Sequence, residues 1–303
     1  MMKYAVCNEF FGAVPLRELA PMVARAGFHG LELAPFTLFE DFSSGGIARG
    51  VAEVRRVLAD NHLEFAGFHW LLAKPEGLRI TALDAGLRRK SWDHLRRLVD
   101  AAGELGGGNL ILGSPKQRGT EAGQTREQAT TILGDELLAI APHAAERGSA
   151  LLLEALSSDQ TDVVNRLSEV EAIVKRVDHP GVGGMFDFHN CADETDSHET
   201  LINRFFGMIG HVHLNDADGG PPKRGDHSFF PAFAKLRSHR YERWVSLEIF
   251  TRPPNPGAVL KETMDFLREI EWMPDTGSRR ILPGCENQNL DGALSPRTSP
   301  AGK

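Results

Sequence analysis

The sequence contains few cysteines, no long apolar run and no excess of basic residues. Its three cysteines, Cys7, Cys191 and Cys285, lie far apart, which argues against a disulfide framework and against a cysteine-based zinc cluster. No apolar run approaches the ~20 residues of a membrane helix, and the N-terminus lacks the apolar core and cleavage site of a signal peptide. A formal net charge of −7 disfavours a nucleic-acid partner. We therefore expect a cytoplasmic protein that binds neither membranes nor nucleic acid.

Short apolar segments alternate with segments of helical periodicity along the whole chain. Of the 303 residues, 41% are apolar and 25% charged, as in an ordinary globular protein. The eight predicted strands are Tyr4–Asn8, Gly30–Leu33, Leu63–His69, Asn109–Leu112 and the segments that end at Glu154, Asp187, His213 and Glu248. Apolar residues at helical spacing follow each strand; after the fifth they are Val163, Leu167, Val170 and Val174.

This alternation predicts an α/β fold, a closed (β/α)₈ TIM barrel. Strands joined through helices pair in parallel, and eight such units fit a barrel of ~250 residues. An open doubly wound sheet is the alternative, but Asn8-Glu9-Phe10-Phe11-Gly12 stands where its glycine-rich phosphate fingerprint would follow the first strand. We predict one barrel domain over residues 1–272. Residues 273–303, rich in Gly, Pro, Ser, Asn and Arg, are predicted to form a flexible tail.

Four of the predicted strands end in a residue that can bind a cation. They are Leu151–Glu154, Gly183–Asp187, His211–His213 and Trp244–Glu248, spaced by roughly 30 residues, about the length of one strand, one helix and two loops. In a barrel the carboxyl ends of neighbouring strands meet at one face. We therefore expect Glu154, Asp187, His213 and Glu248 to converge. Glu32 ends the second strand and is a weaker candidate.

A shared divalent cation explains this group better than four independent side chains. Taken singly, a strand-end glutamate is most often solvated or salt-bridged, and a histidine after an apolar strand is most often structural. Three converging carboxylates would repel one another, and at least one would become protonated. A cation removes that repulsion. Mainly oxygen ligands with one imidazole suit Mn²⁺, which we prefer, or Mg²⁺ or Co²⁺.

Several of these segments resemble one known family, the xylose-isomerase-like TIM barrels, which include sugar isomerases, ketose 3-epimerases and inosose dehydratases. The resemblance covers about residues 3–272 and is carried by Gly27–Leu33, Leu152–Glu154, Phe186–Asn190, His211–Asp216 and Tyr241–Glu248. It implies that Glu154, Asp187, His213 and Glu248 bind one divalent metal ion.

The resemblance also implies a sugar isomerase or epimerase. Such an enzyme removes a proton from a carbon beside a carbonyl, and a metal stabilises the enediolate anion that forms. A base on one face of the substrate and an acid on the other are needed. Glu154 and Glu248, from strands separated by two others, are the candidate catalytic residues for these roles.

Seven further residues are candidates for binding a carbohydrate substrate. His69 and Trp70 follow the third strand, where Trp70 would form an apolar wall for a sugar ring. Lys116 and Arg118 follow the fourth strand and would meet a carboxylate or phosphate. His189 lies two residues after Asp187, whereas the ketose epimerases place their substrate histidine three after. Those epimerases also carry an arginine at the position of Gly219, so Arg224 is a candidate replacement. Asp216 would meet substrate or a site histidine.

Three other functions compete with an isomerase. A lyase or dehydratase acting on a keto-sugar, inosose or keto-glycoside would use the same site. An endonuclease with three zinc ions shares this barrel, but it needs a histidine after the fourth strand, where Leu112-Gly113-Ser114 stands. A non-catalytic partner subunit would not need the metal ligands. A homo-oligomer or a complex with another subunit remains open, as do the substrate, the metal and the role of the tail.

Overall fold

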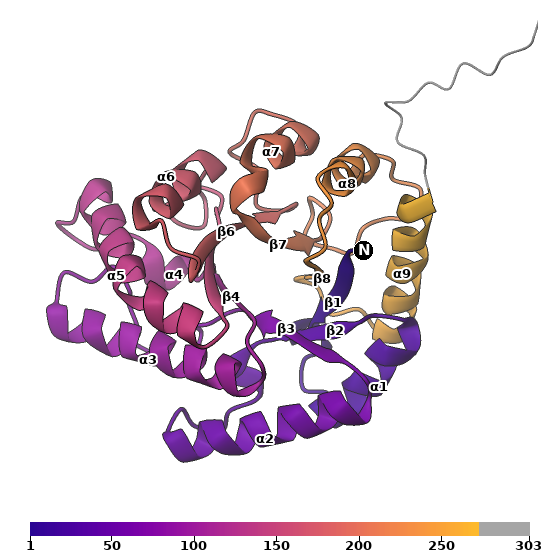
Figure 1. Ribbon diagram of the computed structural model, residues 1–303, viewed down its shortest axis with the longest axis horizontal. Helices are drawn as coiled ribbons and strands as arrows, with labels where there is room; N and C mark the ends of the chain where they lie inside the picture. Colours follow the sequence, from indigo (N-terminus) through magenta and orange to yellow (C-terminus); the bar gives the residue numbers. More distant parts are fainter. Residues whose placement is uncertain (273–303) are drawn as a thin grey trace, which may run out of the picture. The chain divides into compact units, whose positions relative to one another are not determined.

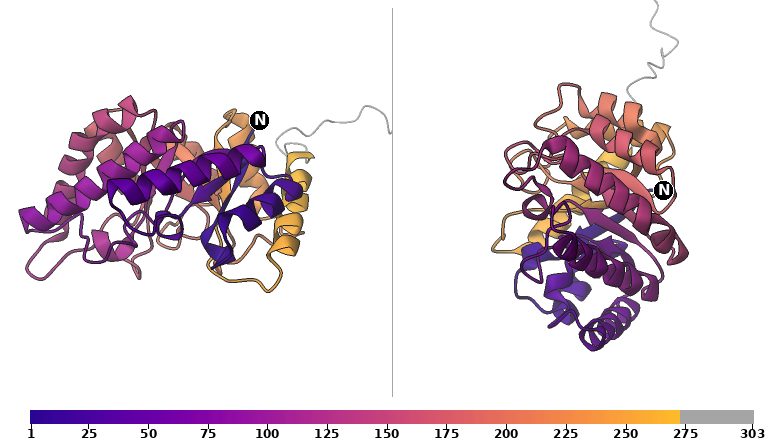
Figure 2. Two further views of the ribbon diagram at one scale, coloured as in Figure 1. Left: turned by 90° about the horizontal axis from the view of Figure 1, so that it is seen from below. Right: turned by 90° about the vertical axis from the view of Figure 1, so that its left-hand side faces the viewer.

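The computed structural model describes residues 1–272, and these form the predicted closed barrel of eight parallel strands. Each strand pairs with the next, and β8 pairs with β1 to close the ring. The strands are β1 (Lys3–Cys7), β2 (Gly30–Leu33), β3 (Glu64–Phe68), β4 (Asn109–Leu112), β5 (Ala150–Leu153), β6 (Val182–Asp187), β7 (Ile209–Leu214) and β8 (Trp244–Leu247). Figures 1 and 2 show helices around these central strands. The predicted flexible tail, residues 273–303, lies outside the described residues.

A helix follows every strand and covers its outer face. The large helices are α1 (Leu16–Ala26), α2 (Ser44–Asp60), α3 (Ala85–Glu104), α5 (Arg126–Glu146), α6 (Leu167–Val177), α7 (His198–Phe205), α8 (Phe229–Ser238) and α9 (Pro256–Trp272). The last helix packs against the first, so the helical layer also closes (Figure 1). None of the helices within residues 1–272 combines the length and apolar character that a membrane span requires.

Short helical segments occupy the connections. A four-residue helix, α4 (Pro115–Arg118), follows β4 and was not predicted, because so short a segment carries no periodicity. The 3₁₀ turns are η1 (Glu9–Phe11), η2 (Pro35–Thr37) and η3 (Phe206–Met208). The first two follow β1 and β2 at the carboxyl-terminal end of the barrel, where they shape the loops around the site.

The helix after β5 begins later than its apolar spacing suggested. Val163 matches the helical pattern but lies in the loop before α6, which starts at Leu167. The Glu169 carboxylate accepts hydrogen bonds from the backbone N–H groups of Asn165 (2.7 Å) and Arg166 (3.1 Å), which caps the helix at this point. Val163 is fully buried all the same, because the loop itself packs on the core.

Side chains alternate between two apolar layers along the strands. Leu110, Leu112, Leu151 and Leu153 belong to the large cluster between strands and helices. Ile111, Leu152 and Met185 form a separate small cluster, as expected for residues that point into the barrel. Ile111 also lines the main pocket of the site. The inner layer therefore forms the base on which the site is built.

Candidate metal centre and active site

The four strand-end residues predicted as metal ligands come together at the carboxyl-terminal mouth of the barrel. Glu154 follows β5, Asp187 ends β6, His213 lies in β7 and Glu248 follows β8. Their ligand atoms all lie within 4.8 Å of one another, and all four residues are buried. His213 Nδ1 lies 2.9 Å from Glu248 Oε2 and 3.6 Å from Asp187 Oδ2. This arrangement is a possible carboxylate and histidine site for a divalent cation.

Sheet register fixes these side chains relative to one another. Asp187 is paired with His213 across β6 and β7, and Glu248 N–H donates to Leu214 O (3.2 Å) just beyond the β7–β8 pairing. The Asn190 amide then bridges two carboxylates, since its Nδ2 donates to Glu154 Oε1 (3.0 Å) and to Asp187 Oδ2 (3.1 Å). The ligand atoms are therefore held by backbone pairing and by one buried amide.

Arg118 supports the site from behind and does not face the pocket. Its guanidinium is fully buried and donates to the carbonyl oxygens of Leu112 (3.1 Å), Glu154 (2.8 Å) and Val164 (3.3 Å). Burial lowers the pKa of Arg118 to about 10, so the group remains charged at neutral pH. The structure therefore gives Arg118 a part in fixing the ends of β4 and β5, in place of the predicted contact with a substrate anion.

The electrostatics of the four residues suit a cation. Burial and the nearby Asp187 and Glu248 carboxylates raise the pKa of Glu154 well above its ordinary value. Burial also raises the pKa of Glu248, although His213 partly offsets the effect. Burial acts to lower the pKa of His213, but Glu248 and Glu32 outweigh it and raise that pKa well above its usual value. Positive charge is thus favoured here, and His213 Nδ1 is buried without a hydrogen-bond partner. These residues fit a divalent cation.

Glu32, at the end of β2, lies against three imidazole rings. Its Oε2 is 2.7 Å from His211 Nε2, and its Oε1 is 3.0 Å from His213 Nε2 and 3.6 Å from His69 Nδ1. Burial acts to raise the pKa of Glu32, but the charges of His211 and His213 lower it well below its ordinary value, so the carboxylate stays ionised. An ionised carboxylate only accepts hydrogen bonds. A neutral His213 therefore donates from Nε2 and keeps the lone pair of Nδ1 for a cation.

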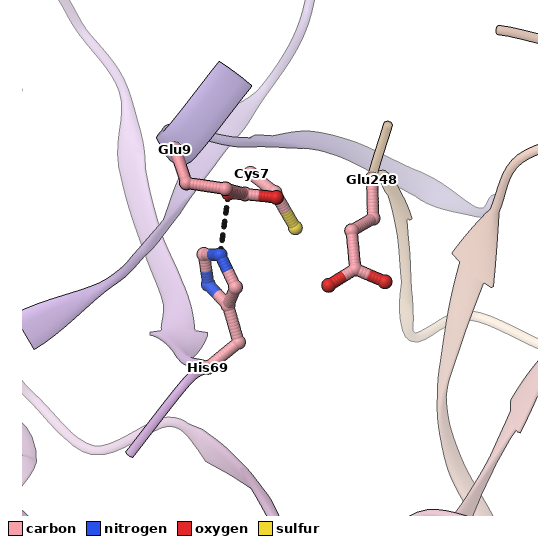
Figure 3. A group of neighbouring side chains, drawn as sticks. All are labelled: Cys7, Glu9, His69 and Glu248. Atoms are coloured by element: carbon pink, nitrogen blue, oxygen red, sulfur yellow. Dashed lines mark hydrogen bonds and ion pairs between the residues drawn. The ribbon is translucent and has the colours of Figure 1, made fainter. Parts of the chain in front are cut away.

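A second group of titratable side chains lies beside the first and shares Glu248 with it. Cys7 ends β1, Glu9 lies in η1, and His69 follows β3; with Glu248 their ligand atoms also lie within 4.8 Å of one another. Figure 3 shows the four side chains pointing toward a common space, with the His69–Glu9 contact drawn. His69 Nε2 lies 2.5 Å from Glu9 Oε2. Charged and polar groups from β1–β3 therefore continue the site beyond the four predicted residues.

The two groups border one pocket of about 280 Å³. Small-molecule pockets usually measure roughly 300–1,000 Å³, so this one suits a small ligand. Six of the predicted site residues line this pocket: Glu154, His213, Glu248, His69, Trp70 and His189. Asp187 lies behind Asn190, which does line the pocket, and accepts its hydrogen bond.

Three predicted substrate residues lie elsewhere. Lys116 is exposed on α4 and does not line the pocket. Asp216 also lies off the pocket wall, where its carboxylate pairs with Lys223 (3.2 Å). Arg224 faces Glu269 of α9 at 3.8 Å. The structure therefore gives these three side chains no place beside the candidate ligands. The site histidines are held by Glu32, in place of the predicted Asp216.

The residues that sequence reasoning missed come mainly from the first three strands. Cys7 and Glu9 were not singled out, and Glu32 was ranked low. Asn190 and Phe250 also line or support the pocket. A signal existed for Glu32 and Cys7, since each lies one residue before the end of a predicted strand, but nothing in the sequence shows which of these side chains meet across a barrel.

Sugar epimerases are among the known proteins that this chain resembles. The chain is 23% identical to a 3-dehydro-D-guloside 4-epimerase of Escherichia coli over 180 residues, covering 57% of this chain and 69% of that protein. It is 22% identical to an L-ribulose 3-epimerase of a Methylomonas species over 245 residues, covering 80% of each. These relatives confirm the predicted enzyme class, an isomerase or epimerase.

The fold is likewise shared with solved structures. A D-psicose 3-epimerase crystallised in the presence of D-fructose superposes with a TM-score of 0.75 at 19% identity, covering 88% of this chain and 98% of the other. The model of the xylose isomerase-like TIM barrel family matches residues 21–270. The chain therefore belongs to the xylose isomerase-like TIM barrel family.

Proposed function

We propose that this chain is a divalent-metal-dependent epimerase of a keto-sugar, which removes and returns a proton on a carbon beside the carbonyl. The observation that carries the proposal is the convergence, within 4.8 Å, of three buried carboxylates and of His213 Nδ1, which has no hydrogen-bond partner. The sugar epimerases among its relatives support the same chemistry. The proposed ligands of one cation are Glu154, Asp187, His213 and Glu248. Mn²⁺ is the preferred ion, with Mg²⁺ or Co²⁺ as alternatives, because Mn²⁺ accepts both carboxylate oxygens and an imidazole nitrogen.

When bound, the cation would supply positive charge beside the substrate carbonyl and stabilise the enediolate anion that follows proton removal. The rest of the chemistry falls to side chains. Glu154 Oε1 is held by Asn190 on the side of Asp187, whereas Oε2 lies against Gly113, another residue of the pocket wall. One oxygen thus faces the other ligands and the second is directed toward the pocket.

Glu154 and Glu248 are the proposed proton carriers. They follow β5 and β8, which are separated by β6 and β7, and both line the pocket. A substrate lying between them would meet one carboxyl group on each face. One residue would take the proton, and the other, already protonated, would deliver its own proton to the opposite face, which inverts the carbon.

The substrate contacts in this proposal come from His69, Trp70 and His189, which line the pocket. A lyase that uses the same proton removal and then expels a neighbouring group remains the alternative. An endonuclease is disfavoured, because among the described residues no Lys or Arg lines the pocket to meet a phosphodiester. The cytoplasmic location and a homo-oligomer or complex with another subunit remain predictions.

The test is metal-dependent proton exchange. EDTA-stripped protein would be incubated in D₂O with ketoses, inososes and 3-dehydroglycosides, with Mn²⁺, Mg²⁺ or Co²⁺ added back. We expect deuterium at a carbon beside the carbonyl only when metal is present, and a product of otherwise unchanged mass. Loss of water from the product would assign a lyase instead.

Two variants locate the chemistry. Glu154→Gln and Glu248→Gln should each reduce exchange by at least about 10²-fold, since each removes one proton carrier. Lys116→Ala, an exposed change off the pocket, is the matched control and should leave exchange intact. Near-normal exchange in either glutamine variant would refute the assigned roles. A protein that binds no divalent metal, measured by calorimetry, would refute the proposal as a whole.

A further inference from the structure

The pocket becomes more exposed and more aromatic from its base to its mouth. Ile111 (1% exposed) and Leu156 (3%) lie at the base, beside the carboxylates. Trp70 and Phe250 also line the pocket but are 39% and 46% exposed. Large side chains that lie in water at a pocket mouth lose apolar exposure when a ligand covers them. They are too open to enclose the reacting carbons, which must lie near Glu154 and Glu248.

Phe250 is held in place at this mouth. Its backbone N–H donates to Gly219 O (2.8 Å), and its ring lies 5.2 Å from the His189 ring at 58°. Gly219 has φ +73°, and a Cβ there would lie 2.7 Å from Phe250 Cδ2. The loop after β7 therefore presents no side chain at this position, and the phenyl ring takes the space.

Trp70 is also fixed by its backbone. Its φ of +51° lies in the left-handed region, which a bulky residue seldom adopts. Ala73 N–H donates to Trp70 O (3.2 Å) and closes the turn. The indole follows His69 directly and stands beside the pocket, so two immobilised aromatic faces flank the opening.

Among residues 1–272, no lysine or arginine lines this pocket, and several nearby basic side chains already have acidic or carbonyl partners. Lys223, in the loop after β7, pairs with Asp216 and Asp218 at 3.2 Å each. Arg224 pairs with Glu269, and Arg118 is buried behind Glu154. Asp159, by contrast, lines the pocket. A phosphate or carboxylate inside the pocket would therefore find no lysine or arginine in the described pocket wall, whereas an uncharged apolar group would not need one.

We propose that the pocket takes an uncharged keto-glycoside with a planar apolar aglycone, which lies against Phe250 and Trp70 while the sugar lies among the carboxylates. This proposal deepens the proposed function and rests on it for the sugar part. The aromatic pair sets substrate preference and takes no part in proton transfer. A free keto-sugar would use only the inner part of the site.

The test compares two ligands that differ only in the aglycone, methyl and phenyl 3-dehydro-D-glucoside, on the metal-loaded protein. We expect phenyl to bind about tenfold more tightly by calorimetry and to show a correspondingly higher kcat/KM for deuterium exchange, because a further aromatic ring loses contact with water. Phe250→Ala should remove most of this preference while keeping exchange with the methyl compound, and Trp70→Ala should also reduce the preference.

The matched control is Phe36→Ala, since Phe36 is 39% exposed in η2 but does not line the pocket. It should keep the full preference. Equal binding of the two glycosides would overturn this inference. If the two glycosides bound equally but deuterium exchange with any keto-sugar persisted, the proposed epimerase function would stand and only the aglycone proposal would fail. A lower molecular mass of Phe250→Ala by light scattering would assign the ring to a subunit contact and also overturn the inference. Absence of exchange with every keto-sugar would refute the proposed function itself.

Discussion

Replacing Glu32 by Gln should weaken divalent-metal binding although Glu32 is not one of the proposed ligands. The carboxylate is fully buried: its Oε1 accepts a hydrogen bond from His213 Nε2 (3.0 Å), its Oε2 lies 2.7 Å from His211 Nε2, and His69 Nδ1 lies 3.6 Å away. A carboxamide of the same shape has one accepting oxygen and one donating NH₂ group. It cannot accept from all the rings, so at least one ring nitrogen loses its acceptor or must change tautomer.

His213 is the ring for which this matters most. If its Nε2 faces the new NH₂ group, the proton moves to Nδ1, the atom directed at Glu248 and Asp187. A protonated Nδ1 cannot bind a cation. Carboxylates that orient a metal-binding histidine typically contribute 10–100-fold to metal affinity, which is about 1.4–2.8 kcal/mol. Loss of the negative charge of Glu32 should also weaken Mn²⁺ binding.

The assay is Mn²⁺ affinity of Glu32→Gln by calorimetry, with thermal unfolding of the metal-free protein to establish that the fold is intact. Glu9→Gln is the matched control. It removes the same charge from another carboxylate that contacts a histidine, but Glu9 contacts His69 and makes no contact with His213. We expect the Mn²⁺ affinity of the Glu9→Gln control to change by less than about threefold. A folded Glu32→Gln with wild-type affinity would refute the reasoning.

Three further outcomes follow from the structure. Mn²⁺ at 100 times its Kd should stabilise the protein by about 2.7 kcal/mol, and Asp187→Asn, measured by thermal unfolding, should lose most of that gain. Arg118→Met should cost roughly 3 kcal/mol in urea unfolding because three carbonyls lose a donor, whereas the exposed neighbour Lys116→Met should change little. Burial lowers the pKa of His94 from 6.5 to about 4. The unfolded chain therefore binds more protons between these values, and stability falls as pH drops from 6.5 toward 4, by at most about 3 kcal/mol. His94→Gln should flatten that part of the pH profile; an unchanged slope would contradict the assignment.

The fold and the four proposed ligands could be predicted because both depend on local patterns. A short apolar run predicts a buried strand wherever it lies, and eight strands alternating with helices leave few topologies. A ligand that ends its strand reaches the barrel mouth whatever the details of the loops. Glu154, Asp187, His213 and Glu248 satisfy this condition, and the structure brings them within 4.8 Å.

The remaining residues could not be predicted because their positions depend on loops. Lys116 and Arg118 are two residues apart on α4, yet one is exposed and the other is buried against backbone carbonyls. Arg224 was expected near the substrate and pairs with Glu269 instead. Val163 fits a helical pattern but belongs to a buried loop, because helix capping by Glu169 fixes where α6 begins. In each case the direction of a side chain depends on tertiary contacts, and spacing along the chain carries no record of them.

Glu32 shows the same limit within the site. Its strand, β2, does not neighbour β7, which carries His211 and His213, so no pairing pattern connects them. The contact exists only because the barrel closes and directs both strand ends toward its axis. Within residues 1–272 no lysine or arginine pairs with this carboxylate, and a buried charge is costly without compensation. The histidines provide that compensation, and in doing so they acquire fixed orientations. Glu32, from the first half of the barrel, was hard to interpret from sequence. It nevertheless orients His213, a proposed metal ligand from the second half.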